Sequence, residues 1–265
     1  MREQCAFILG LRPLPALYGE MGWCAVKYRL YANIFRFWNR LMKLPDDNIT
    51  KHIFQRDISQ SENGKSNWSS DFKSLLFKVF PTVQENTWHS RLYDMKVVKL
   101  KLFSLMEKRW KTDVYSKPKL RRYMTFKTTL TASKYVTGFF VKSKRSLMAQ
   151  LITGILPLSL ETGRRKRIKD PLTGVIRNLR VEERTCNLCQ LGETEDEIHF
   201  SCVCPFYNEL RIELYKTLND SYSSFPSCLT KENKYIFMVT EGWKEFAKYL
   251  ELIWKKRKEH FYVES

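Results

Sequence analysis

Four residues of metal-ligand type within nineteen positions constrain this chain more than any other feature. Cys186 and Cys189 are followed by His199 and Cys204, which gives the pattern C-x2-C-x9-H-x4-C. Zn²⁺ prefers four Cys or His ligands in a tetrahedron, and a closed set of four protein ligands is typical of a structural site. The two-residue gap permits a tight turn that directs both sulfurs at one ion, and Gly192 lets the loop reverse. The spacing therefore predicts one structural zinc ion.

The fourth ligand has a rival, because Cys202 would give H-x2-C in place of H-x4-C. Pro205 directly follows Cys204, and proline is favoured in the first turn of a helix. A thiolate at a helix start is stabilised by the helix dipole. We therefore assign Cys204 as the ligand and interpret Cys202 as a core thiol. The alternative for the whole set is a group of buried free thiols beside a surface histidine, whereas disulfides fit less well with seven cysteines and no convincing secretory signal.

The second constraint is charge, since the chain carries a net charge of +18 with a pI near 9.6. Fifteen Lys or Arg stand against two acids over residues 96–146, and eight against three over residues 164–184. Such blocks are often solvated faces, but aromatic residues are interleaved with these. Phosphates can bind the cations while exposed bases stack on the aromatics, so we expect RNA or DNA as a partner. The predicted contact residues are Arg164, Arg165, Lys166, Arg167, Arg177 and Arg180, with Lys119, Arg121 and Arg122 as a second block.

Apolar periodicity predicts a mainly α-helical protein with a small zinc-knuckle and hairpin module and closing C-terminal helices. We divide the chain into an irregular segment (1–25), a helical basic region (26–160), the zinc-knuckle module (161–220) and C-terminal helices (221–265). The first helix is expected over residues 26–43 with an apolar face of Leu30, Ile34, Phe37 and Leu41. Further helices are predicted over 49–57, from about 68 to 80, and over 85–110, 143–151, 205–218, 230–240 and 241–260. Residues 167–181 predict a hairpin, and 123–141 fit a helix or a strand.

The helix starts have alternative caps: Asp47 or Asn48 for the second helix, and Asn67 or Ser69 for the third. Asp46 and Asp47 are the nearest approach to a pair of catalytic carboxylates, but capping explains Asp47 more simply. The acidic run at residues 195–197 is interpreted as a solvated part of the metal loop. No glycine-rich phosphate loop is present, and His52, His89 and His260 stand apart from any nucleophile motif. We expect no enzymatic activity.

Several segments resemble the C-terminal region of reverse transcriptases from LINE-type (non-LTR) retrotransposons. They are residues 146–163, 183–189, 195–200 and 204–207, together with 7–13, 19–23 and 34–40 near the N-terminus. The resemblance implies a CCHC zinc knuckle that helps to hold template RNA and target DNA, with Cys186, Cys189, His199 and Cys204 at the ligand positions. The aromatic-x-Asp-Asp motif of the polymerase is absent from this sequence, so the resemblance implies a truncated remnant whose partners include the missing polymerase domain.

The expected location is intracellular, in a nuclear or cytoplasmic ribonucleoprotein. No apolar run approaches the roughly 20 residues of a membrane helix, so no membrane partner is expected. The short apolar patch at residues 6–9 has no evident local partner. A zinc-stabilised protein-interaction module in a host-adopted protein is the alternative function, and an inactive pseudogene product is the third. Salt dependence separates the first two, because counterion release from nucleic acid gives a steep slope.

Overall fold

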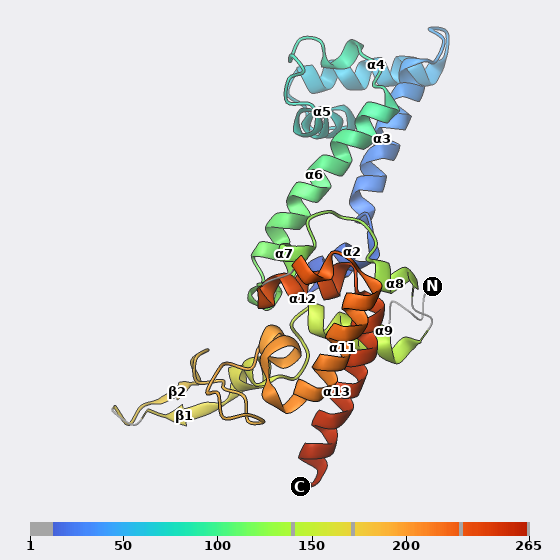
Figure 1. Ribbon diagram of the computed structural model, residues 1–265. Helices are drawn as coiled ribbons and strands as arrows, with labels where there is room; N and C mark the ends of the chain where they lie inside the picture. The colour runs from blue at the N-terminus through green and yellow to red at the C-terminus, as the bar shows by residue number, and fades with distance from the viewer. Residues whose placement is uncertain (1–12, 139–140, 171–172, 228–229, 264–265) are drawn as a thin grey trace. The chain divides into compact units, whose positions relative to one another are not determined.

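The computed structural model describes residues 13–138, 141–170, 173–227 and 230–263. The described residues form two compact units, of which the smaller comprises Cys24–Thr112 and the larger the rest. Both are built mainly from helices, and the larger contains a two-stranded antiparallel hairpin close to a Cys3His group (Figure 1). The predicted fold class is confirmed. Among the described residues, no helix combines the length and apolar character needed to cross a bilayer.

The smaller unit consists of four helices and one short turn. These are α3 (Val26–Met42), α4 (Ile49–Glu62), α5 (Trp68–Val79), the 3₁₀ turn η1 (Trp88–Ser90) and α6 (Met95–Tyr115), which continues into the larger unit.

The aromatic core of the smaller unit lies on one face of α3. Trp38 is fully buried and stacks on Phe72 with ring centroids 4.0 Å apart, while its indole N–H donates to the carbonyl of Arg91 at 3.1 Å. Phe35 is also fully buried and meets the rings of Phe72 and Tyr93 edge-on. These contacts fix α3 against α5 and against the irregular segment that precedes α6.

The predicted apolar face of α3 is wrong for two of its four members. Leu30 is 55% exposed and Phe37 47% exposed, whereas Leu41 is buried as expected. Apolar residues occur around most of this helix, so periodicity alone left its orientation open. The larger rings of Phe35 and Trp38 decide the orientation, because burying them removes more apolar surface from water.

Asparagine side chains begin two of these helices. Asn48 caps α4 by accepting from the Thr50 N–H at 2.9 Å. Asn67 caps α5 in a capping box, in which its side chain accepts from the Ser70 N–H at 3.0 Å and the Ser70 hydroxyl accepts from the Asn67 N–H at 2.9 Å. In both places the structure selects one of the two caps that the sequence allowed.

The larger unit is assembled around the C-terminal helix α13. Its elements are α2 (Leu14–Met21), η2 (Pro118–Leu120), α7 (Tyr123–Phe126), α8 (Lys134–Gly138), α9 (Lys142–Ile152), α10 (Ser159–Thr162), η3 (Gly163–Arg165), β1 (Arg167–Lys169), β2 (Ile176–Asn178), the π-helical turn η4 (His199–Val203), η5 (Pro205–Tyr207), α11 (Asn208–Ser221), η6 (Phe225–Ser227), α12 (Lys231–Thr240) and α13 (Trp243–Val263).

Helix α13 packs against α9, α11 and α12, as Figure 1 shows. Phe246, Leu250 and Ile253 form its core-facing stripe and are fully buried, at the spacing expected of one helix face. Because α9 packs on α13, residues 113–160 belong with the C-terminal helices. The predicted segment 26–160 is therefore divided between the two units.

Three stretches differ from the sequence-based expectation or complete it. The N-terminal segment contains a helix, α2, which ends at Gly22 with φ of +61°. A Cβ at Gly22 would lie 2.4 Å from the Ala132 nitrogen, so glycine is required there. The undecided stretch 123–141 contains the short helices α7 and α8, and the long helix expected from residue 85 begins only at Met95. The apolar patch at residues 6–9 lies outside the described residues.

A matched pair of substitutions in α3 tests which face is buried. We expect Phe35→Ala to lower the free energy of unfolding by about 3–5 kcal/mol, because it leaves a cavity in a closed aromatic cluster. Phe37→Ala removes the same side chain from the exposed side and should cost about 1 kcal/mol or less. Urea unfolding followed by tryptophan fluorescence measures both. Equal losses, or a larger loss for Phe37→Ala, would contradict this orientation.

Candidate metal centre

The four residues of the spacing motif meet at one point in the larger unit. The ligand atoms of Cys186, Cys189, His199 and Cys204 all lie within 4.8 Å of one another. The two sulfurs of Cys186 and Cys204 are 3.9 Å apart, and the Cys189 sulfur is 3.4 Å from Nε2 of His199. All but Cys189 are buried. These residues form a group that can hold a metal ion with four protein ligands.

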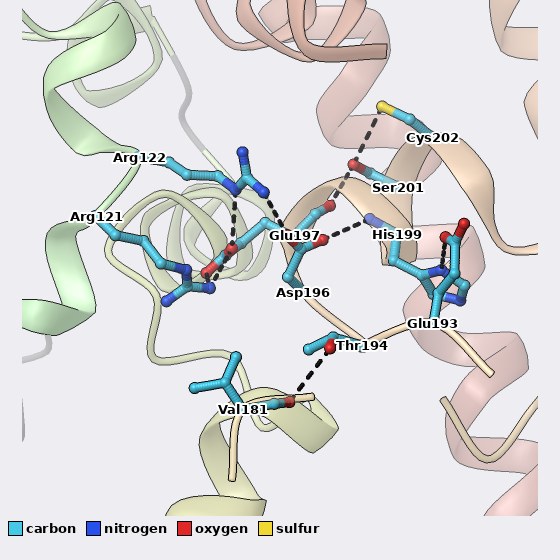
Figure 2. Close-up of polar contacts among 10 residues, drawn as sticks. All are labelled: Arg121, Arg122, Val181, Glu193, Thr194, Asp196, Glu197, His199, Ser201 and Cys202. Atoms are coloured by element: carbon cyan, nitrogen blue, oxygen red, sulfur yellow. Dashed lines mark hydrogen bonds and ion pairs between the residues drawn. The ribbon is translucent and has the colours of Figure 1, made fainter. Parts of the chain in front are cut away.

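Cys202, the rival fourth ligand, does not belong to this group. Its sulfur lies 3.5 Å from the Ser201 hydroxyl, and in Figure 2 its side chain points away from the His199 ring. Desolvation raises the pKa of the Cys202 thiol to about 11. This thiol stays protonated near neutral pH, as the core-thiol interpretation requires.

Two local backbone devices bring the ligands together. Thr185 and Thr194 pair as an isolated antiparallel bridge, and the Cys186 N–H donates to the Glu193 carbonyl at 3.0 Å. Gly192 completes this short loop with φ of +67°. The turn η4 then places His199 and Cys204 on the other side of the site, since the Cys204 N–H donates to the His199 carbonyl at 2.8 Å. Cys204 immediately precedes η5, as the proline after it predicted.

Hydrogen bonds within the Cys3His group and to Glu193 shift the pKa values of its side chains. The contact between the two thiol groups raises the pKa of Cys186 to about 12 and lowers the pKa of Cys204. Burial opposes protonation of His199, but hydrogen bonds to Cys186 and Glu193 outweigh it and raise its pKa to about 9. A bound cation would reverse this balance, because it needs thiolates and a neutral imidazole.

Glu193 is a residue of the site that sequence reasoning missed. One of its carboxylate oxygens lies 3.1 Å from Nδ1 of His199 (Figure 2), and Nε2 of the same ring faces the Cys189 sulfur. Histidine ligands commonly hold their second nitrogen against a carboxylate, because this fixes the ring and its tautomer. An acid six positions before the histidine was the available signal.

The acidic run after Glu193 is not the solvated loop that we predicted. Glu195 is 1% exposed and Glu197 5% exposed. Glu195 pairs with Arg257 of α13, whose Nη2 lies 3.0 Å from its Oε2, and the same oxygen accepts from the backbone N–H and the hydroxyl of Ser159 at 2.7 and 2.8 Å. The prediction fails because a carboxylate with a charged partner and a full set of donors can be buried.

Two arginines of the second predicted contact block hold the other acids of this run. Figure 2 shows Arg121 reaching Glu197, at 2.7 Å between Nη2 and Oε1, and Arg122 reaching Asp196. Asp196 also accepts from the His199 N–H at 2.8 Å, so it joins an arginine to a metal ligand. Both arginines are thus engaged in ion pairs that hold the loop of the candidate metal group in place.

The remaining predicted contact residues fall into two sets. Lys119 and Arg164 pair with Glu161, and Arg177 bonds both Asp170 and Glu183. The other set is exposed and makes no ion pair among the described residues; it comprises Arg165, Lys166, Arg167 and Arg180. All four lie in or beside the β1–β2 hairpin, so the hairpin is one accessible part of the basic surface.

The pairing of Glu195 with Arg257 yields a stability prediction. We expect Arg257→Met to cost about 3–5 kcal/mol of unfolding free energy, because it leaves a carboxylate buried and unpaired. Adding Glu195→Gln should recover a large part of this loss. The matched control is Lys255→Met on the same helix, whose side chain is 75% exposed and which should change stability by about 0.5 kcal/mol or less. Urea unfolding of Arg257→Met, Glu195→Gln, their double variant and Lys255→Met measures the coupling, and strictly additive losses would contradict it.

Comparison with known proteins adds no relative to this description. No protein-family model, curated protein or solved structure matches the chain. The donor set, the ion pairs and the distribution of charge are therefore the features that bear on function.

Proposed function

We propose that the chain binds nucleic acid without catalysing a reaction on it, and that Cys186, Cys189, His199 and Cys204 hold one structural Zn²⁺. Three thiolates and one imidazole are a soft donor set that suits zinc, whereas calcium and magnesium require oxygen ligands. A closed set of four protein ligands supports a structural role, because a catalytic zinc keeps one position for water or substrate.

The observation that carries the nucleic-acid proposal is the pairing of the carboxylates around the hairpin with Arg177. Arg177 binds both Asp170 and Glu183, at 2.6 Å to each. Its hydrogen bonds lower the pKa of Glu183 to about 2, so this ion pair persists at neutral pH. Arg177 offsets one of these two carboxylate charges, and residues 164–184 carry eight Lys or Arg against three acids, so the exposed cations leave this segment positively charged. Such clusters attract phosphates and release counterions on binding.

The family resemblance supports the same proposal. A LINE-type origin would make this chain correspond to the C-terminal region of a reverse transcriptase, and the zinc-binding part of that region is associated with template RNA and target DNA. A polymerase domain of that family would then be a further partner, and a ribonucleoprotein in the nucleus or cytoplasm the setting. The net charge of +18 fits such a partner.

Metal analysis of the purified full-length chain tests the zinc site. We expect one zinc per chain by mass spectrometry, lost in Cys186→Ser and in Cys204→Ser because each removes one of four ligands. Cys202→Ser is the matched control and should keep the metal, since its thiol lies outside the group. Absence of zinc from the parent chain would overturn the site, and loss of zinc in Cys202→Ser would overturn the ligand assignment.

Salt dependence of binding tests the partner. We expect a fluorescent oligonucleotide to bind with a steep decrease of log K against log salt. The combined variant Arg165→Ala, Arg167→Ala and Arg180→Ala should make that slope shallower by about 2–3, because each lost phosphate contact removes about 0.7–0.9. Lys231 is an exposed cation at the start of α12, and Lys231→Ala should change the slope by less than the roughly 0.7–0.9 expected for one phosphate contact. A flat slope for the parent chain, with binding to acidic proteins instead, would favour the protein-interaction hypothesis.

A further inference from the structure

A cleft of about 580 Å³ lies in the larger unit, between the base of the hairpin, the start of the metal loop and the C-terminal part of α13. Its volume falls in the range of roughly 300–1,000 Å³ that is usual for sites that enclose a small ligand. The lining residues that matter here are Lys166, Arg184, Asn187, Trp254, Lys258 and Phe261.

The cleft is cationic after its internal ion pairs are taken into account. Its acidic lining residue, Glu183, is bound by Arg177, and its buried arginine, Arg257, is bound by Glu195. Lys166, Arg184 and Lys258 also line it and make no ion pair among the described residues. An anion that enters this cleft therefore meets three cations, against the single lining carboxylate of Glu183, whose partner Arg177 is shared with Asp170.

Arg184 is a cation held in a fixed place. Its guanidinium donates to the carbonyl of Leu160 at 3.1 Å and to the carbonyl of Leu179 at 2.8 Å. Carbonyl groups carry no net charge, so these bonds orient the guanidinium without neutralising it. Gly163 leaves room for this side chain, because a Cβ there would lie 2.7 Å from Cγ of Arg184.

Two aromatic rings line the same cleft. Trp254 is partly exposed, and its ring is held edge-on by the fully buried ring of Phe200, with centroids 6.2 Å apart. Lys258 Nζ lies 5.8 Å from the Trp254 ring centroid. Phe261 is 39% exposed, with the Arg257 guanidinium 5.1 Å from its ring centroid. Aromatic faces next to cations are the combination on which unpaired bases and their phosphates bind.

We propose that this cleft binds unpaired nucleotides of a single-stranded nucleic acid. The phosphate lies against Lys166, Arg184 and Lys258, a base stacks on Trp254 or Phe261, and the exposed amide of Asn187 faces the base edge. A duplex would bind less well, because its bases are stacked on one another and cannot reach the rings. The inference rests on the proposed function and specifies the form of strand and the residues that hold it.

Binding of labelled 12-nucleotide single strands and of the matching duplex to the full-length chain, followed by anisotropy, tests the proposal. We expect Phe261→Ala to weaken single-strand binding about tenfold through lost stacking, while duplex binding changes less than about twofold. Phe261→Tyr keeps an aromatic ring and should restore the affinity. The pair Lys166→Ala and Lys258→Ala should reduce the single-strand salt slope by about 1.4. Lys255→Ala, on the same helix but outside the cleft lining, is the control.

An abasic single strand separates stacking from charge. It should bind the parent chain about tenfold more weakly than the normal strand, and Phe261→Ala should not weaken it further. Unchanged circular dichroism melting of each variant shows that the fold is intact. Equal effects on single strand and duplex, or no effect of Phe261→Ala, would overturn the cleft while nucleic-acid binding stands. Failure of the parent chain to bind any strand would overturn both proposals.

Discussion

The architecture of the larger unit depends on the buried ion pair and hydrogen bonds of the Glu195 carboxylate. It lies two residues after Glu193, whose carboxylate contacts His199 of the candidate metal group, and it accepts from Arg257 of α13 and from Ser159 at the start of α10. Three segments far apart in sequence therefore converge on one side chain. A buried charge with one partner removed is costly, so each segment depends on the others for its position.

This convergence sets the metal loop apart from a self-sufficient zinc knuckle. Small zinc modules fold around their ion because the ion supplies most of the stabilisation. Here the loop is also held by Arg121 and Arg122 through Glu197 and Asp196, outside the four ligands. Metal binding at this group would thus be linked to the folding of the larger unit, and a peptide confined to the loop would lack these arginines and α13.

The Cys3His group could be predicted from the sequence because its four members lie close together along the chain. Cys186 and Cys189 lie in one tight turn, His199 begins one π-helical turn and Cys204 directly follows it, so nineteen residues suffice for the four to meet. The helix caps at Asn48 and Asn67 were likewise narrowed to two candidates each, since capping depends on the next three residues. Most helices could likewise be predicted from apolar periodicity, because that pattern is also local in the sequence.

Features that depend on contacts between residues far apart in the sequence could not be predicted from the sequence. An acidic run looks solvated unless its arginines are known, and Arg257 lies 62 residues from Glu195, with Arg121 76 residues from Glu197. The orientation of α3 depended in the same way on Phe72 and Tyr93, which are contributed by later segments. Counting cations consequently identified a basic protein but did not show which of the cations remain accessible.

The same ion pairs that bury the acids also determine where positive charge remains. Arg121, Arg122 and Arg177 are occupied by carboxylates, whereas Lys166, Arg184 and Lys258 remain around a cleft whose walls include Trp254 and Phe261. Phe200, which holds Trp254, lies next to His199, and Asn187 lies next to Cys186. A metal ion bound by these ligands would therefore fix both the stacking surface and the polar group of the cleft. The candidate metal group and the proposed single-strand site therefore share the segment that contains Cys186 and Asn187.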